Sequence, residues 1–153
     1  LPVCYEEEFA PDLKDVVNKT NLTPDEVIAL HTSRILEVAI MGFLPGLGYL
    51  TGVDDALHLP RRSVPRTFVP QGSVGLAMDQ TVIYPLNSPG GWNLIGRMPI
   101  PLFDQKRENP ILFSAGDQVS FYAVNADKYE ELAASCVDGN LPICPEQADE
   151  AAL

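Results

Sequence analysis

Arginines alternate with backbone-stiffening prolines in PRRSVPRTFVPQGSVG, residues 60–75. Arg61, Arg62 and Arg66 fall within six residues of one another. A guanidinium group such as that of Arg66 binds a carboxylate or a phosphate through two parallel hydrogen bonds. On a chain whose formal net charge is −11, a basic strip of this kind indicates a small anionic ligand. The alternative is an ordinary solvated loop.

The end of the same stretch offers hydrogen-bonding groups beside the arginines. Gln71, Ser73 and the backbone at Gly72 could each bind a polar ligand atom. The P-loop pattern G-x-x-x-x-G-K-[ST] does not occur, so the stretch is a weak candidate for a phosphate cradle. The stretch therefore indicates a polar binding loop but does not identify its ligand.

Two further residues could take part in chemistry. His31 stands near the expected end of a helix, where an imidazole can serve as an acid, a base or an anion contact; it could equally cap the helix C-terminus. Trp92 follows SPGG, residues 88–91, which we expect to form a tight turn, and could stack on a ligand or plug the mouth of a barrel. Neither G-x-S-x-G nor H-E-x-x-H occurs, so the standard catalytic sets are missing.

A glycine-rich loop, GFLPGLGYLTG at residues 42–52, carries no charge. In a helix interior Gly costs about 1 kcal/mol and Pro about 3 kcal/mol relative to Ala, so the segment is not helical. It is also too apolar for a solvated loop. We expect it to line a groove, with its glycines bringing the backbone close to a ligand; the alternative is a packed corner of the core.

Two helices are expected before most of the strands. In APDLKDVVNKTN, residues 10–21, the apolar side chains fall on one helical face. In LTPDEVIALHTS, residues 22–33, Thr23 is an N-cap, Pro24 occupies the first helical position and Glu26 completes a capping box.

The rest of the chain alternates short apolar runs with turn residues. LPVCYEE is predicted to be a short strand and ILEVAIMGF, residues 35–43, a buried strand. Further strand-like segments are TFVP, SVGLAM, TVIYPL, WNLIGRMP and QVSFYAV. Their spacing predicts a mainly β fold with a few helices, in the form of a closed or nearly closed antiparallel barrel. NADKYEELAA, residues 125–134, is predicted to be helical, and residues 135–153 to form an acidic, flexible tail.

The composition favours a folded domain and disfavours several partners. With 46% apolar residues the chain is too hydrophobic to be disordered. Its acidic excess disfavours nucleic acid, and the lack of an apolar run of about 18 residues predicts no membrane span. Cys4, Cys136 and Cys144 lack the C-x-x-C spacing of zinc sites, so no metal is expected. We expect reduced thiols in a cytoplasmic protein, with a Cys136–Cys144 bridge as the alternative.

Six motifs occur together in the order and spacing of one family. They are LPVCYEEEFAPDL, HTS at residues 31–33, GFLPGLGYLTG, PRRSVPRTFVPQGSVG, QTVIYPLNSPGGWNLIGR and PILFSAGDQVSF. Through them the chain resembles the family of 5-oxoprolinase B subunits, also called allophanate hydrolase subunit 1. The resemblance implies a cyclophilin-like β-barrel for residues 1–134. Family members carry a small α/β domain before this stretch, and because the chain begins with Leu1 instead of Met, we expect that domain to be missing here.

The same resemblance implies a function and partners. Members of the family act with subunits A and C to hydrolyse 5-oxoproline to glutamate, and the complex consumes ATP. The alternative is a KipI-like protein that inhibits a sensor histidine kinase and has no catalysis of its own. Prolyl isomerase activity would rest on the barrel fold alone, which does not determine function.

Carried over by position, the resemblance also implies a set of groove residues. They are His31, Phe43, Pro45, Gly46, Tyr49, Arg66, Gln71, Ser73, Gln80, Ser88 and Trp92. In the expected arrangement Arg66 holds the substrate carboxylate, and Gln71 or Gln80 binds the lactam. The rings of Phe43, Tyr49 and Trp92 form walls. His31 polarises the lactam carbonyl or relays a proton.

Overall fold

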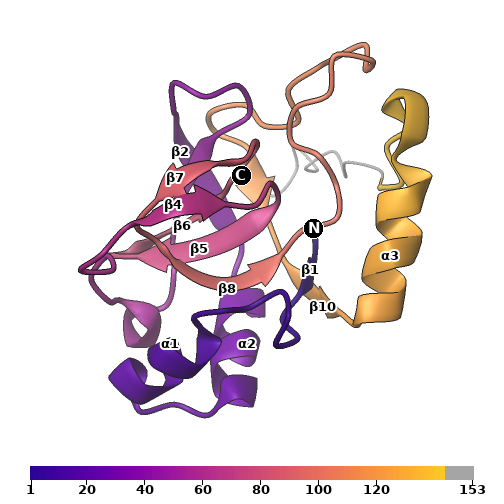
Figure 1. The fold of residues 1–153 in the computed structure, drawn as a ribbon. Coiled ribbons are helices and arrows are strands. Elements are labelled where there is room, and N and C mark those ends of the chain that lie inside the picture. The colour runs from indigo at the N-terminus through magenta and orange to yellow at the C-terminus, as the bar shows by residue number, and fades with distance from the viewer. Residues whose placement is uncertain (144–153) are drawn as a thin grey trace, which may run out of the picture.

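The structure is a computed structural model that describes residues 1–143. Over this range it contains helices α1 (Leu13–Thr20), α2 (Pro24–Thr32) and α3 (Ala126–Ser135) and the 3-10 turns η1 (Asp55–Leu57) and η2 (Val137–Gly139) (Figure 1). The strands are β1 (Pro2–Cys4), β2 (Leu36–Met41), β3 (Gly48–Thr51), β4 (Arg66–Val69), β5 (Ser73–Ala77), β6 (Gln80–Ile83), β7 (Ser88–Gly90), β8 (Asn93–Arg97), β9 (Gln118–Val119) and β10 (Tyr122–Val124).

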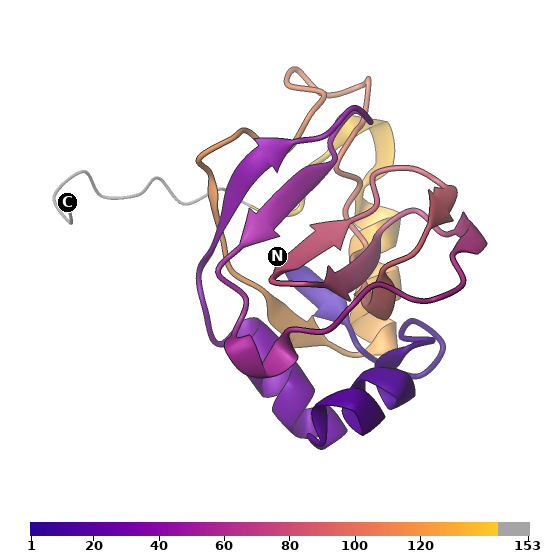
Figure 2. The ribbon, with the colours of Figure 1, turned by 90° about the vertical axis from the view of Figure 1, so that its left-hand side faces the viewer.

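Eight of the strands form one curled sheet in the order β10-β1-β8-β5-β6-β3-β2-β9 (Figure 2). Its two outermost strands, β9 and β10, are separated in sequence only by Ser120 and Phe121. Because successive Cα atoms are about 3.8 Å apart, this short link holds the two edges of the sheet close together. The predicted mainly β, barrel-like fold is confirmed. One pairing differs from the antiparallel expectation, since β1 runs parallel to β10.

A second sheet consists of β4 and β7, which pair antiparallel with Arg66 opposite Gly90 and Val69 opposite Ser88. Val69 is fully buried in one cluster with side chains of the large sheet. This β4–β7 ribbon therefore covers part of the outward face of the curled sheet (Figure 1).

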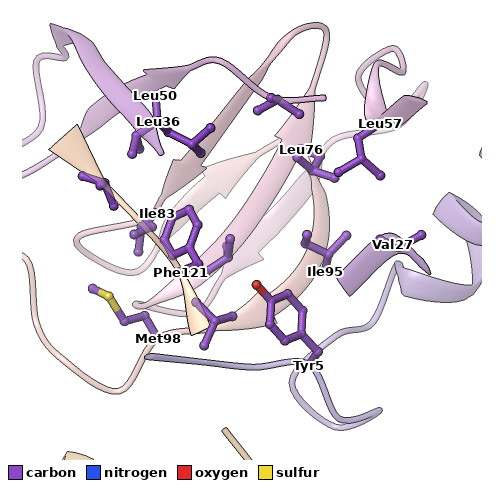
Figure 3. Packing of buried hydrophobic residues seen from close by; sticks show 14 of the residues in the cluster. Tyr5, Val27, Leu36, Leu50, Leu57, Leu76, Ile83, Ile95, Met98 and Phe121 are labelled. Atoms are coloured by element: carbon purple, nitrogen blue, oxygen red, sulfur yellow. The ribbon is translucent and has the colours of Figure 1, made fainter. Parts of the chain in front are cut away.

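The main hydrophobic core fills the inside of the curled sheet (Figure 3). Its largest fully buried side chains come from the sheet, η1 and the 98–102 segment, and they include Leu36, Leu50, Leu57, Leu76, Ile83, Ile95, Ile100 and Leu102. Burying one Leu or Ile side chain stabilises a fold by about 1.5–3 kcal/mol. This core provides the rigid support on which the outward-facing residues are held.

Helices α1 and α2 close one end of the barrel (Figures 1 and 2). They bury Val16 and Val27 in the main core. The predicted capping box of α2 is confirmed. The Glu26 N–H donates to Thr23 Oγ1 at 3.2 Å, and the Thr23 N–H donates to Glu26 Oε2 at 2.7 Å. None of the helices in residues 1–143 has the length and hydrophobicity needed to cross a bilayer.

Strand β2 corrects the expectation of a fully buried strand. Leu36 and Val38 are buried, but Glu37 is exposed and Ile40 is 64% exposed. Only the side chains of β2 that point into the barrel find others to pack against. The predicted strand QVSFYAV likewise divides into β9 and β10, because the chain passes from one sheet edge to the other between them.

The chain continues to pack against the barrel beyond residue 134. Cys136, Leu141 and Ile143 contact the main core. The rest of the expected tail, with Cys144, lies outside the residues that the structure describes.

Candidate functional site

The sheet divides the predicted site residues, because successive side chains of a strand point to opposite faces. On β6, Thr81 points inward to His31, whereas Val82 points outward. Tyr49 of β3 lies opposite Val82, and Trp92 belongs to the same outward cluster. His31 is therefore on the other side of the sheet from Tyr49 and Trp92.

His31 is enclosed in the protein interior, with 2% of its surface exposed. Its Nδ1 lies 2.7 Å from the Tyr5 hydroxyl, and its Nε2 lies 3.2 Å from Thr81 Oγ1. Because Thr81 donates its own proton to the Gly75 carbonyl, Nε2 carries the imidazole proton and Nδ1 accepts from Tyr5. The ring also stacks on Phe121, with centroids 4.7 Å apart. Burial lowers the pKa of His31 to about 3, so the ring is neutral in this position.

The outward face of the sheet carries a second apolar cluster, which we call the outer cluster. Its buried members are Leu47, Val69, Ala77, Val82, Tyr84, Trp92 and Leu94, with Leu44 and Tyr49 packed against them. The rings of Tyr49 and Trp92 lie 6.1 Å apart between centroids and are tilted by 50°. The structure thus brings together two of the three rings expected to form walls.

The guanidinium group of Arg66 is occupied by a carboxylate of the chain itself. Its Nη1 and Nη2 donate to the two oxygens of Asp12, each at 2.6 Å. Asp12 is 1% exposed and accepts further hydrogen bonds from Arg62 and from the Leu94 backbone N–H. The hydrogen bonds that we expected Arg66 to make to a substrate are therefore made to Asp12. Sequence reasoning missed Asp12, which sits 54 residues before Arg66.

Arg61 is the arginine of the basic strip that points to the outer cluster. Its side chain is exposed and takes part in no ion pair within residues 1–143. Its guanidinium carbon lies 5.6 Å from the centre of the Trp92 ring, which places a cation over an aromatic face. The sequence indicated an anion-binding arginine in the basic strip, but it did not distinguish Arg61 from Arg62 and Arg66.

Backbone contacts on both sides of Arg61 hold it in this position. The Pro60 carbonyl accepts from Asn93 Nδ2 at 2.9 Å. The Arg62 N–H donates to the Gly91 carbonyl at 2.8 Å. The neighbours of Arg61 in the chain are thus hydrogen-bonded to the neighbours of Trp92, Pro60 to Asn93 and Arg62 to Gly91.

Two hydroxyl groups of this region lack a hydrogen-bond acceptor among the described residues, those of Tyr84 and Ser88. Ser88 stands opposite the buried Val69 across the β4–β7 ribbon, so its side chain points to the outer cluster. Tyr84 is 6% exposed, and a Cβ atom at Gly90 would lie 2.2 Å from its hydroxyl oxygen. Burial raises the pKa of Tyr84, against the lowering effect of the Trp92 backbone N–H, of Arg61 and of Arg66. The phenol is therefore neutral and can donate its proton.

The remaining polar candidates fall into two places. Ser73 and Gln80 lie on the outward face, because their neighbours Val74 and Thr81 point inward. Ser73 is buried and Gln80 is half-buried. Gln71 is exposed and lines a separate cavity of about 160 Å³, next to Gly72, Tyr84 and the 98–102 segment.

Only the first half of the expected glycine-rich loop is a loop, because Gly48–Thr51 forms strand β3. Residues 42–47 form a packed corner that also lines the outer cluster. Leu44 and Leu47 pack into the cluster, and the Gly42 N–H donates to the Leu47 carbonyl at 2.7 Å. Gly46 has φ +87° and lies so close to the Leu102 backbone that a Cβ would approach it to 3.1 Å. Pro45 is exposed, and Phe43 is 90% exposed at the tip of the loop, so it is the expected ring that does not join the outer cluster.

Comparison with known proteins places these features in a family. A family model described as the carboxyltransferase domain, subdomain C and D, matches residues 1–113. The chain is 44% identical to the 5-oxoprolinase B subunit of Bacillus subtilis (strain 168) over 129 residues, covering 84% of this chain and 54% of the relative. It is 47% identical to the 5-oxoprolinase B subunit of Haemophilus influenzae over 121 residues, which cover 79% of this chain and 57% of that relative. The chain thus spans about half the length of the curated relatives it matches.

A solved structure agrees with these relatives in sequence and in fold. The crystal structure of a conserved uncharacterized protein from Pyrococcus horikoshii superposes with a TM-score of 0.81 at 40% identity, covering 84% of this chain and 60% of that one. The likeness to 5-oxoprolinase B subunits inferred from the motifs is confirmed, and the chain belongs to the family of carboxyltransferase domains, subdomain C and D.

Proposed function

We propose that this chain forms part of the B subunit of an ATP-dependent 5-oxoprolinase, which opens 5-oxoproline to glutamate. The observation that carries the proposal is the 44–47% identity to proteins named as this subunit of 5-oxoprolinase. The reaction breaks the lactam C–N bond and adds water, which leaves the amine and the second carboxylate of glutamate. Opening a planar amide requires the ring to be held while its carbonyl is activated.

The outer cluster is the part of the barrel best suited to hold such a substrate. 5-Oxoproline is a small flat ring with one carboxylate and one lactam amide. Tyr49 and Trp92 supply apolar faces for the ring, and Arg61 supplies a cation beside them. Gln80, half-buried on the same face of the sheet, has an amide that can pair with the lactam. We assign His31 a structural role, because its two ring nitrogens are already bonded inside the core.

We further propose that activity requires subunits A and C, and that ATP is consumed by the assembled cytoplasmic complex. The relatives are named as one subunit of an enzyme, which supports an assembly of several chains. Both steps, ATP use and ring opening, are assigned to the complex and not to residues of this chain alone.

The test is reconstitution of the full-length protein with its subunits A and C. We expect glutamate release from 5-oxoproline only when ATP and all three subunits are present. An assembled and soluble complex that releases no glutamate would contradict the proposal. In that case a sensor histidine kinase whose autophosphorylation falls when this protein is added would point to the KipI-like alternative.

A further inference from the structure

The outer cluster contains hydrogen-bond donors that the fold itself leaves unused. The hydroxyl groups of Tyr84 and Ser88 are buried, and neither has an acceptor among the residues that the structure describes. Leaving a buried polar group without its partner costs about 1–3 kcal/mol. Such groups are rare in folded proteins and call for an explanation, of which a ligand that supplies the acceptor is one.

The backbone of β7 fixes the Tyr84 hydroxyl in place. A Cβ at Gly90 would come within 2.2 Å of this oxygen and 2.8 Å of two ring carbons. Glycine is therefore the only residue that leaves room for the phenol at this point. Ser88 lies two residues earlier on the same strand, so its side chain and the α-carbon hydrogen of Gly90 point to the same face.

Of the three arginines near these hydroxyls, two are paired with carboxylates and, in the part of the chain that the structure describes, one is not. Arg62 and Arg66 both contact Asp12, and Arg62 also lies 3.8 Å from a carboxylate oxygen of Asp15. These two arginines are balanced by two carboxylates. Arg61 has no such partner within residues 1–143, and its guanidinium lies over Trp92, which belongs to the same outer cluster as Tyr84. A single uncompensated positive charge matches a singly charged anion.

We infer that Tyr84 and Arg61 form the binding site for the carboxylate of a small cyclic acid. One carboxylate oxygen accepts the Tyr84 proton, and the other accepts from the Arg61 guanidinium. The Ser88 hydroxyl donates as a second neutral group, and the Trp92 ring supplies the apolar floor. The exposed Arg61 side chain closes over the bound acid. The inference deepens the proposed function, on which it rests for the identity of the ligand as 5-oxoproline.

Direct binding to the full chain tests this site without other subunits or ATP. Isothermal titration calorimetry compares 5-oxoproline with 2-pyrrolidone, which has the same lactam ring but no carboxylate, and with inorganic phosphate. The site variants are Tyr84→Phe and Arg61→Gln. Their matched controls are Tyr122→Phe, at a side chain 49% exposed on β10, and Arg34→Gln, at an exposed arginine paired with Asp54.

We expect both site variants to weaken 5-oxoproline binding by about 10- to 100-fold, as the loss of a hydrogen bond to a charged group does. The controls bind like the wild type, and 2-pyrrolidone binds all variants weakly and equally. Tyr84→Phe unfolds at the same temperature as the wild type or higher, because it removes a buried hydroxyl that lacks an acceptor. If Tyr84 had only a structural role, any loss of binding in Tyr84→Phe would be accompanied by a loss of stability.

Equal affinity of the wild type and Tyr84→Phe for 5-oxoproline would overturn the inference. So would a wild type that binds inorganic phosphate more tightly than 5-oxoproline, or that binds no 5-oxoproline. The proposed function is judged separately, by glutamate release from the assembled subunits. Binding that is lost in both site variants supports the site even where the assembly releases no glutamate.

Discussion

Arg66 and Asp12 form a bidentate salt bridge in which both nitrogen–oxygen distances are 2.6 Å, although the residues are 54 positions apart in the sequence. Asp12 is the N-cap residue of α1, and Arg66 begins β4. A third hydrogen bond, 2.7 Å from the Leu94 N–H, fixes the carboxylate to β8. This contact joins the helical end of the barrel to the ribbon that covers the outer cluster. We infer that it holds the 60–66 segment, and Arg61 with it, above Trp92.

Replacing Asp12 by Asn tests how much this salt bridge contributes to the free energy of unfolding. The amide can still accept from the Leu94 N–H, but two guanidinium groups lose their counter-charge. Breaking a buried pair on one side typically costs about 3–5 kcal/mol, and since both arginines are partly exposed we expect about 3 kcal/mol here. Urea unfolding measures the loss. The control is Asp15→Asn at an exposed carboxylate, for which we expect less than about 0.5 kcal/mol; similar losses for both variants would contradict the assignment.

The buried His31 makes the stability of the protein depend on pH. Its pKa is lowered to about 3 in the folded protein, against about 6.5 when unfolded. The unfolded chain therefore binds a proton that the folded chain excludes, so this contribution to stability is complete above pH 6.5 and is lost as the pH falls towards 3. Between pH 7 and pH 5 the loss amounts to about 2 kcal/mol.

Urea unfolding at pH 7 and at pH 5 measures this dependence. We expect His31→Gln to be less stable at pH 7 but to lack the additional loss of about 2 kcal/mol at pH 5. His58→Gln, at the second histidine of the chain, should retain the wild-type loss. A pH dependence that survives in His31→Gln and disappears in His58→Gln would contradict the placement of His31 in the core.

Gly90 and Gly91 provide a matched pair for testing the packing over Tyr84. A methyl group at Gly90 would lie 2.2 Å from the Tyr84 hydroxyl, whereas one at Gly91 would meet only Pro65 at ordinary contact distance, 3.7 Å or more. Overpacking a tight site typically costs about 1–3 kcal/mol, so we expect Gly90→Ala to lose that amount. Gly91→Ala should stay within about 0.5 kcal/mol of the wild type. Thermal unfolding distinguishes the two, and equal stabilities would refute the described fit of the phenol beneath β7.

Features that depend on neighbouring residues were predictable from the sequence. The capping box of α2 uses side chains three positions apart, and its hydrogen bonds are those expected. Most strands of the barrel followed from apolar runs and turn residues, because each of these strands lies within one such run. Strand β3 was not predicted, because Gly48–Thr51 belongs to the segment that we expected to be a loop. Two further departures in the sheet, the half-buried β2 and the parallel pair β1–β10, depend on which segments become neighbours in space.

The candidate site depends more strongly on long-range pairing. Nothing near Arg66 in the sequence indicates that its guanidinium pairs with Asp12. The sequence alone therefore could not show which arginine of the basic strip is held by a carboxylate of the chain itself. The burial of His31 likewise depends on Tyr5, Thr81 and Phe121, which come from three other parts of the chain. The rings of Tyr49 and Trp92 do lie close together, and the resemblance of their motifs to a family suggested this proximity; their role as walls of a binding site stays a prediction.

Steady-state kinetics of the assembled complex can decide whether the outer cluster binds the substrate of a 5-oxoprolinase. Glutamate release with ATP is measured for complexes that contain the wild type, Arg61→Gln or the control Arg34→Gln. We predict that Arg61→Gln lowers kcat/KM for 5-oxoproline by at least about 10-fold, mainly by raising KM, while Arg34→Gln matches the wild type. A wild-type kcat/KM in the Arg61→Gln complex would show that the substrate binds elsewhere.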